Sequence, residues 1–307
     1  MKATFDYKDC QICPQDCGVN RLIGEKGFCN TGMELSVSSV VTHKGEEPVI
    51  SGDKGICNVF FGHCNLQCLY CQNHQISRNV NHFDHKDLDL IKVTQQIVRR
   101  LKTGITHLGF VSPSHVPLQM KMIINSVRAE QFDPVIVYNS NGYDGLQTLK
   151  TLEPDIDIYL PDFKYADNEL SLQYSGAGDY VENVVKSISE MIAQKGELKL
   201  NGYGLASNGV IIRHLVLPGH IQNSIDVLRI IAKEFGTSIH LSLMAQYYPM
   251  QAIKEYPNMS RILNPIEYDQ VLEELEKLGF ENGWVQELES NSNYLPDFEK
   301  EEPFERN

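Results

Sequence analysis

The chain has no cysteine after residue 71, although eight cysteines lie between Cys10 and Cys71. It also lacks a block of Lys or Arg and carries a net charge of −13, which argues against binding to nucleic acid. No apolar run approaches the roughly 20 residues that a membrane span requires, and the polar start does not resemble a secretory signal. We therefore expect a cytoplasmic protein that binds neither nucleic acid nor a membrane.

The spacing of the cysteines separates two possible uses. Disulfides are rare in reducing compartments, and a disulfide framework would be spread over a secreted chain. Here the cysteines cluster at two- and three-residue spacings, which favours metal or iron–sulfur ligation.

The remainder of the chain alternates short apolar segments with helix-like segments. Strands are predicted at 55–61, 105–111, 134–138, 156–161, 210–217 and 238–244, and helices at 88–102, 118–129, 143–152, 180–194, 224–235 and 266–278. The alternation predicts an α/β fold with a parallel sheet, as a partial (β/α)6 barrel or an open doubly wound sheet. In both architectures, ligands bind at the carboxyl ends of the strands.

Composition suggests three parts. Residues 1–52 are rich in Cys and Gly and poor in helix signals, so we expect a small, irregular Cys-rich N-terminal module that binds metal. Residues 53–290 form the predicted core domain, with a hairpin or loop inserted at 196–209. Residues 291–307 are acidic and polar, and we expect a loosely ordered tail.

The strongest motif is Cys64-x-x-x-Cys68-x-Tyr70-Cys71, directly after the first predicted strand. Three thiolates in one loop can hold three corners of a 4Fe–4S cluster and leave one iron open for a ligand. The Tyr70 ring would shield the cluster and pack on that ligand. The alternative is a zinc knuckle with Cys57 as the fourth ligand, although Cys57 also reads as a small buried hydrophobe.

This motif resembles the hallmark of the radical S-adenosylmethionine (SAM) superfamily. The sequence from Cys10 to about Leu288 is similar to pyruvate formate-lyase activating enzymes, and more closely to their uncharacterised relatives with a Cys-rich N-terminus. The resemblance implies a radical SAM type of barrel, a 4Fe–4S cluster on Cys64, Cys68 and Cys71, and S-adenosylmethionine on the open iron. The reduced cluster of that family cleaves the sulfonium to methionine and a 5′-deoxyadenosyl radical.

Further segments extend the resemblance. Asn139–Tyr143 borders the cofactor in the family, Asp162-Phe163-Lys164 resembles an Asp-x-Lys element that contacts it, and Arg213–Gly219 resembles an Arg-x-x-x-x-Pro-Gly strand. Where the activating enzymes carry Gly-Gly-Glu, this chain has Val111–His115, which removes a carboxylate but retains hydroxyls. The cofactor-binding residues implied in this way are Tyr70, Ser112, Ser114, Asn141, Asp162, Lys164 and Arg213.

The first four cysteines, Cys10, Cys13, Cys17 and Cys29, supply enough thiolates for a zinc site or for a second 4Fe–4S cluster. The sequence leaves both alternatives open. Several other side chains are candidates for substrate contact, with local packing, capping or solvated loop charge as the alternative in each case. These are Glu46, Glu47, His115, Gln246, Tyr247 and Tyr248.

The resemblance predicts hydrogen abstraction by a radical enzyme, with a glycyl radical enzyme as the candidate partner and a flavodoxin- or ferredoxin-type protein as the electron donor. The catalytic residue that would act on a substrate is not identified. One alternative is modification of a peptide or small molecule by the same radical. Another is a zinc-stabilised binding protein without catalysis.

Overall fold

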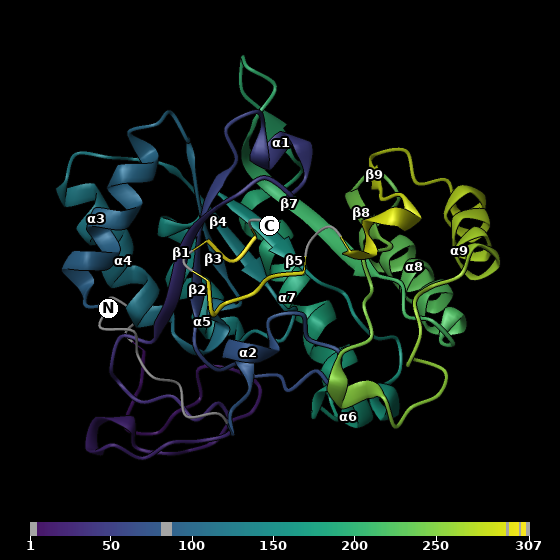
Figure 1. The fold of residues 1–307 in the computed structure, drawn as a ribbon, viewed down its shortest axis with the longest axis horizontal. Helices are drawn as coiled ribbons and strands as arrows, with labels where there is room; N and C mark the ends of the chain where they lie inside the picture. The colour runs from purple at the N-terminus through teal and green to yellow at the C-terminus, as the bar shows by residue number, and fades with distance from the viewer. Residues whose placement is uncertain (1–4, 81–87, 293–294, 301, 305–307) are drawn as a thin grey trace.

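The computed structural model describes residues 5–80, 88–292, 295–300 and 302–304 (Figure 1). In this part of the chain, nine strands form one sheet in the order β1-β2-β3-β4-β5-β7-β8-β9, with β6 paired to β7. The strands are β1 Val37–His43, β2 Ile56–Phe61, β3 His107–Val111, β4 Val135–Ser140, β5 Ile158–Pro161, β6 Lys199–Leu200, β7 Ala206–Leu215, β8 His240–Met244 and β9 Gly283–Val285.

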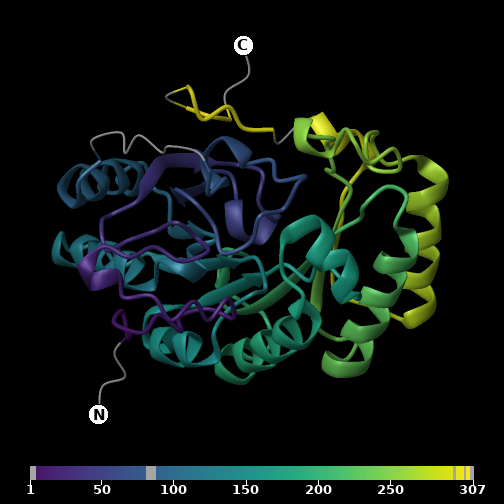
Figure 2. The ribbon, with the colours of Figure 1, turned by 90° about the horizontal axis from the view of Figure 1, so that it is seen from below.

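The helices cover the outer side of the curved sheet, as Figure 2 shows for α3 to α5 and α7 to α9. The α-helices are α1 Pro48–Ser51, α2 His74–Ser77, α3 Leu90–Leu101, α4 Pro117–Ala129, α5 Leu146–Leu152, α6 Asn168–Ser175, α7 Tyr180–Lys195, α8 Ile221–Phe235 and α9 Pro265–Leu278. None of the helices in the described ranges is long and apolar enough to cross a membrane.

Local chemistry sets where the helices begin. The Asp89 side chain accepts a hydrogen bond from the Lys92 amide at 2.8 Å and so caps the start of α3. At the start of α9, Asn264 and Glu267 form a reciprocal capping box. These contacts satisfy amide donors that have no partner inside the helix.

The predicted α/β fold with a parallel sheet is confirmed. The six predicted strands correspond to β2, β3, β4, β5, β7 and β8, which pair in parallel in that order. Strand β2 is buried along its whole length, as expected for a strand inside a parallel sheet that is covered on both faces. The predicted insertion at 196–209 is a hairpin, in which Lys199 pairs with Asn208.

The structure corrects two expectations. The sequence predicts an irregular fold for residues 1–52, but β1 lies within that range and pairs antiparallel with β2. The serines of β1 interrupt the apolar pattern by which a buried strand is predicted. The strand lies at the edge of the sheet and is buried because α3 packs beside it. The tail was expected to be loosely ordered, yet Phe298 is only 4% exposed and packs edge-on against Phe60 at 5.2 Å. Burial of this ring fixes a segment that is otherwise polar.

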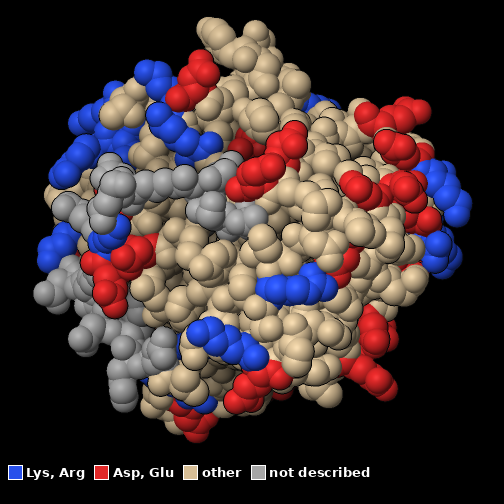
Figure 3. Space-filling view, turned by 45° about the vertical axis from the view of Figure 1, so that its right-hand side comes forward, with Lys and Arg blue, Asp and Glu red and all other residues tan. Residues whose placement is uncertain are grey.

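Strand direction places the motif residues together. The parallel strands present their carboxyl ends at one end of the sheet, where the segments after β2, β3, β4 and β5 carry Cys64, Ser112, Asn141 and Asp162. On the face in Figure 3, acidic side chains are spread over the surface and basic ones form small separate groups.

Candidate functional site

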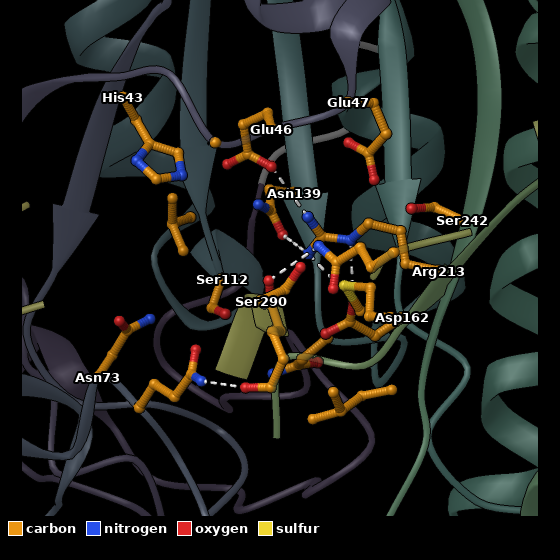
Figure 4. Close-up of a pocket in the computed structure, with 18 of the residues that line it drawn as sticks. His43, Glu46, Glu47, Asn73, Ser112, Asn139, Asp162, Arg213, Ser242 and Ser290 are labelled. Carbon is orange, nitrogen blue, oxygen red and sulfur yellow. Dashed lines mark hydrogen bonds and ion pairs between the residues drawn. The ribbon is translucent and has the colours of Figure 1, made fainter. Parts of the chain in front are cut away.

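A cavity of about 640 Å³ opens at the carboxyl ends of the parallel strands. This volume is typical of small-molecule sites. Its wall comes from the loop after β2, the ends of β3, β4, β5, β7, β8 and β9, the segment between β1 and α1, and residues near the C-terminus. Figure 4 shows Glu46, Asn139, Asp162 and Arg213 converging in this cavity.

The three cysteines of the motif all line the cavity, and each sulfur accepts a hydrogen bond from a different part of the chain. Asn141 Nδ2 donates to Cys64 Sγ at 3.4 Å. Ser175 Oγ donates to Cys68 Sγ at 3.0 Å, and Ser77 Oγ donates to Cys71 Sγ at 3.3 Å. Hydrogen bonds of this kind stabilise negative charge on sulfur, as ligation of an iron–sulfur cluster requires.

Cys57 is not part of this arrangement. It lies on β2 opposite Leu108 of β3, is fully buried in the hydrophobic core and does not line the cavity. The zinc knuckle with Cys57 as fourth ligand therefore has no support in this geometry.

The donor set of the motif can be compared with what a cluster requires. In residues 5–80, 88–292, 295–300 and 302–304, no group of three or more His, Cys, Asp or Glu side chains is already arranged to hold a metal ion. Each thiolate of a 4Fe–4S cluster binds a different iron. Three thiols on one cavity wall, without a fourth cysteine in the described lining, match a cluster with one iron left open.

A network of buried charges forms another part of the wall. Arg213 Nε donates to Asp162 Oδ1 at 3.0 Å, and Arg213 Nη1 donates to Glu46 Oε2 at 3.1 Å. Lys164 Nζ donates to Asp162 Oδ2 at 2.6 Å. Burial alone would raise the pKa of Asp162, but Lys164 and Arg213 outweigh it and hold that pKa below its usual value. Asp162 is therefore an ionised carboxylate at neutral pH.

The segment after β4 brings Asn141 to the cysteines. Asn141 Nδ2 also bonds Asn65 Oδ1 at 2.7 Å, and Asn141 is only 4% exposed. The next residue, Gly142, has a φ of +83°, and a Cβ there would lie 2.3 Å from the Asp162 carbonyl oxygen. Glycine is required at this close approach, which joins the ends of β4 and β5.

The segment after β3 divides between the cavity and the core. Ser112 lines the cavity, in a left-handed conformation with a φ of +49°. Ser114 is fully buried and does not line it. His115 is also fully buried, and its Nε2 lies 3.0 Å from the Gly62 carbonyl oxygen. Burial lowers the pKa of His115 to about 4, so this histidine is a neutral structural residue.

Two tyrosine hydroxyls connect the cysteine loop to Ser175. Tyr70 lines the cavity, and its hydroxyl lies 2.7 Å from that of Tyr165, which in turn lies 2.6 Å from Ser175 Oγ. This chain of hydroxyls ends at the Ser175 bond to Cys68. It orients the donor on that sulfur, and the sequence motif alone did not indicate Tyr165 or Ser175.

The candidates after β8 have different positions. Gln246 lines the cavity, and its carbonyl oxygen accepts a hydrogen bond from Gln72 Nε2 at 2.7 Å. Tyr247 is buried and bonds the Met259 carbonyl oxygen at 2.7 Å, so it packs beneath the loop. Tyr248 is 37% exposed and lies outside the cavity lining.

The segment between β1 and α1 supplies two carboxyl groups. Glu46 and Glu47 both line the cavity, and Figure 4 shows them on the side of Arg213 that faces away from Asn73. Glu47 is 7% exposed, and its Oε2 has no hydrogen-bond partner in the described residues. Burial raises the pKa of Glu47 above its usual value, although Arg213 opposes this shift.

The N-terminal cysteines form a separate group outside the cavity lining. Cys10, Cys13 and Cys29 are buried, Cys17 is half-buried, and all four are free thiols. Cys13 lies close enough to the other three for each of them to raise its pKa, although burial is the largest cause of that shift. The structure thus brings together all four predicted ligands.

Comparisons with known proteins identify relatives in both sequence and fold. No family model matches the chain. It is 30% identical over 277 residues to the uncharacterised protein MJ0674 of Methanocaldococcus jannaschii, covering 88% of this chain and 75% of that protein. It is 24% identical over 269 residues to the uncharacterised protein MJ0808 of the same organism, covering 81% and 73%.

Solved structures share the fold at low sequence identity. HydG, a maturase of the FeFe-hydrogenase, matches with a TM-score of 0.53 and 13% identity, over 78% of this chain and 53% of that one. Methylornithine synthase (PylB) matches with a TM-score of 0.50 and 15% identity, over 75% and 64%. The chain thus spans between half and two thirds of these two proteins. The chain thus shares its α/β fold with HydG and methylornithine synthase, and it belongs to the same family as MJ0674.

Proposed function

We propose that this protein is a radical SAM enzyme that binds a 4Fe–4S cluster through Cys64, Cys68 and Cys71. S-adenosylmethionine would bind in the adjoining cavity. The observation that carries the proposal is the convergence of three hydrogen-bonded thiols on one wall of a cavity whose described lining has no fourth cysteine. When bound, the cluster supplies an electron that cleaves S-adenosylmethionine to methionine and a 5′-deoxyadenosyl radical.

The residues of the chain have distinct parts in this proposal. Asp162 is an ionised acceptor for an ammonium or ribose hydroxyl, and Lys164 offsets a ligand carboxylate. Arg213 fixes Asp162 and keeps it ionised. Asn141 and Ser112 present an amide and a hydroxyl to the same cavity, whereas Ser114 would act only through the packing of its segment.

The finer proposal is activation of a glycyl radical enzyme, with a flavodoxin- or ferredoxin-type protein as the reductant. Its support is the resemblance of the motif segments to pyruvate formate-lyase activating enzymes. A mixture of the reduced protein, S-adenosylmethionine and a candidate partner should then give an electron paramagnetic resonance (EPR) signal of a glycyl radical. If no glycyl radical signal forms with candidate partners that are encoded by neighbouring genes, activation of a glycyl radical enzyme would be contradicted.

A second candidate is modification of a small polar molecule by the same radical. The segment that carries Glu46 and Glu47 lines the cavity, and so do Ser290 and Phe304 from the C-terminal region. Phe304 packs on His43 with ring centroids 4.3 Å apart. The cavity wall thus includes residues from both ends of the described chain, and its volume of about 640 Å³ favours a substrate that fits inside it.

A pair of cysteine variants tests the proposed cluster. Cys71→Ala removes a ligand, whereas Cys57→Ala removes a buried thiol from the same part of the sequence and serves as the matched control. Under anaerobic conditions, Cys71→Ala should lose the EPR signal that shifts on addition of S-adenosylmethionine, and Cys57→Ala should keep it. Equal signals in the two variants would exclude this loop as the cluster site.

A further inference from the structure

The N-terminal cysteines lie around a buried cation, Arg21. Arg21 is 2% exposed, and its Nη2 donates to Cys29 Sγ at 3.2 Å. Its Nη1 donates to the His115 carbonyl oxygen at 2.8 Å. No Asp or Glu in the described ranges forms an ion pair with Arg21, and its buried Nε has no acceptor there.

A buried guanidinium requires a counter-charge, because an isolated charge in the interior costs several kcal/mol. The carbonyl of His115 and the ring of Tyr7, 5.6 Å from the guanidinium carbon, offer only partial charges. Neutral thiols would leave Arg21 without an anion. Thiolates bound to a metal supply the missing negative charge, so the surroundings of Arg21 favour a metal–thiolate site.

Four thiolates can bind either one zinc ion or a 4Fe–4S cluster. Zinc has no redox chemistry, whereas a cluster takes up and releases single electrons. What the four thiols adjoin therefore bears on which of the two they bind.

Two of the cysteine sulfurs accept hydrogen bonds, as is typical of an iron–sulfur cluster whose charge changes on reduction. The Phe28 amide donates to Cys17 Sγ at 3.3 Å, as Arg21 does to Cys29. Hydrogen bonds to sulfur stabilise the additional negative charge of a reduced cluster and raise its reduction potential. Cys17 is half-buried and Phe28 is 37% exposed, so this edge of the site faces solvent.

The N-terminal site also adjoins the motif loop. The Asn79 side chain donates to the Phe28 carbonyl oxygen at 2.6 Å and to that of Cys64 at 3.0 Å, and it accepts from the Cys64 amide at 3.1 Å. Gln15 Nε2 donates to the Asn65 carbonyl oxygen at 3.0 Å. One side chain thus connects the residue before Cys29 with Cys64, which places the two cysteine groups side by side.

We propose that Cys10, Cys13, Cys17 and Cys29 hold a second 4Fe–4S cluster, not zinc, and that this cluster takes up an electron at the protein surface. The step is a one-electron reduction: a low-potential one-electron donor is oxidised, the cluster is reduced, and no bond or proton moves. The inference goes beyond the proposed function, because it concerns a site outside the cavity.

Metal counting on the full chain tests this proposal. After anaerobic reconstitution, wild type should contain about eight irons and about eight sulfides per chain and no zinc. Cys13→Ala and Cys71→Ala should each retain about four irons. Two results would overturn the proposal. One is a wild type that contains four irons and one zinc. The other is a wild type that contains four irons and no other metal, and that loses these irons in Cys71→Ala but not in Cys13→Ala.

This design separates the second site from the first. Four irons that survive in Cys71→Ala and disappear in Cys13→Ala would support the second cluster even if the motif loop held none. Should Cys13→Ala fail to fold, the EPR spectrum of dithionite-reduced wild type decides, since two adjacent clusters give spin-coupled signals. A single uncoupled cluster signal would contradict the proposal. Arg21→Gln should lower the reduction potential of one cluster, and an unchanged potential would count against Arg21 as its counter-charge.

Discussion

Replacement of Arg213 by methionine should destabilise the protein through its buried carboxylates. The guanidinium contacts Asp162 and Glu46, and its side chain is 11% exposed. Methionine keeps a comparable apolar length but removes the charge. Asp162 would then retain Lys164 as its cation, whereas the Glu46 carboxylate would keep the Asn58 amide at 3.0 Å and no cation among the described residues.

The size of the effect follows from this asymmetry. Breaking a buried ion pair by removal of one partner typically costs about 3–5 kcal/mol. Because Asp162 keeps its ion pair with Lys164, we expect Arg213→Met to lower the free energy of unfolding by about 3 kcal/mol, the lower end of this range. Neutralising the stranded carboxylate in Arg213→Met/Glu46→Gln should recover roughly 1–2 kcal/mol, since an unpaired buried acceptor costs about that much.

Urea denaturation of wild type, both single variants and the double variant gives the four free energies of unfolding. The cycle isolates the coupling between Arg213 and Glu46. The reasoning would be refuted by a loss below about 1 kcal/mol in Arg213→Met, the size of an exposed ion pair. A double variant less stable than Arg213→Met would also refute it.

Two further predictions concern Glu47 and the tail. Burial raises the pKa of Glu47, so the folded state binds its proton more tightly and loses stability as pH rises above the ordinary value of 4.5. The stability of Glu47→Gln relative to wild type should therefore increase as the pH rises above 4.5 in thermal unfolding, and a constant difference would contradict the shift. Phe298→Ala should lower the free energy of unfolding by about 2–3 kcal/mol and speed proteolysis of the tail, because it removes a buried ring. Leu295 is 37% exposed, so Leu295→Ala should change both quantities little. Equal effects of the two substitutions would contradict the packing of Phe298.

Local sequence patterns were sufficient to predict the parallel sheet and the cysteine loop. The spacing of Cys64, Cys68 and Cys71 is short enough to be read within one loop, and the apolar runs of β2 and β3 are continuous because both faces are covered. Strand β1 was missed because its serines interrupt the apolar pattern, and its burial depends on α3 and on the packing of Val41 in one cluster with Phe298 of the tail.

Long-range contacts were beyond what one sequence reveals. Ser175 reaches Cys68 from 107 positions away, and Arg213 reaches Glu46 from 167 positions away. Nothing in either segment indicates its partner, because the pairing follows from which strands become neighbours. The motif resemblance identified Asp162 and Arg213 singly, whereas the structure shows that they form one network with Glu46.

The central claim is that the Cys64 loop holds a cluster that cleaves S-adenosylmethionine. The most direct measurement is the amount of 5′-deoxyadenosine formed when anaerobically reconstituted wild type is mixed with S-adenosylmethionine and dithionite. We predict formation of 5′-deoxyadenosine and methionine in equal amounts, and none with Cys68→Ala. A wild-type protein that contains zinc instead of iron in this loop and forms no 5′-deoxyadenosine would contradict the claim.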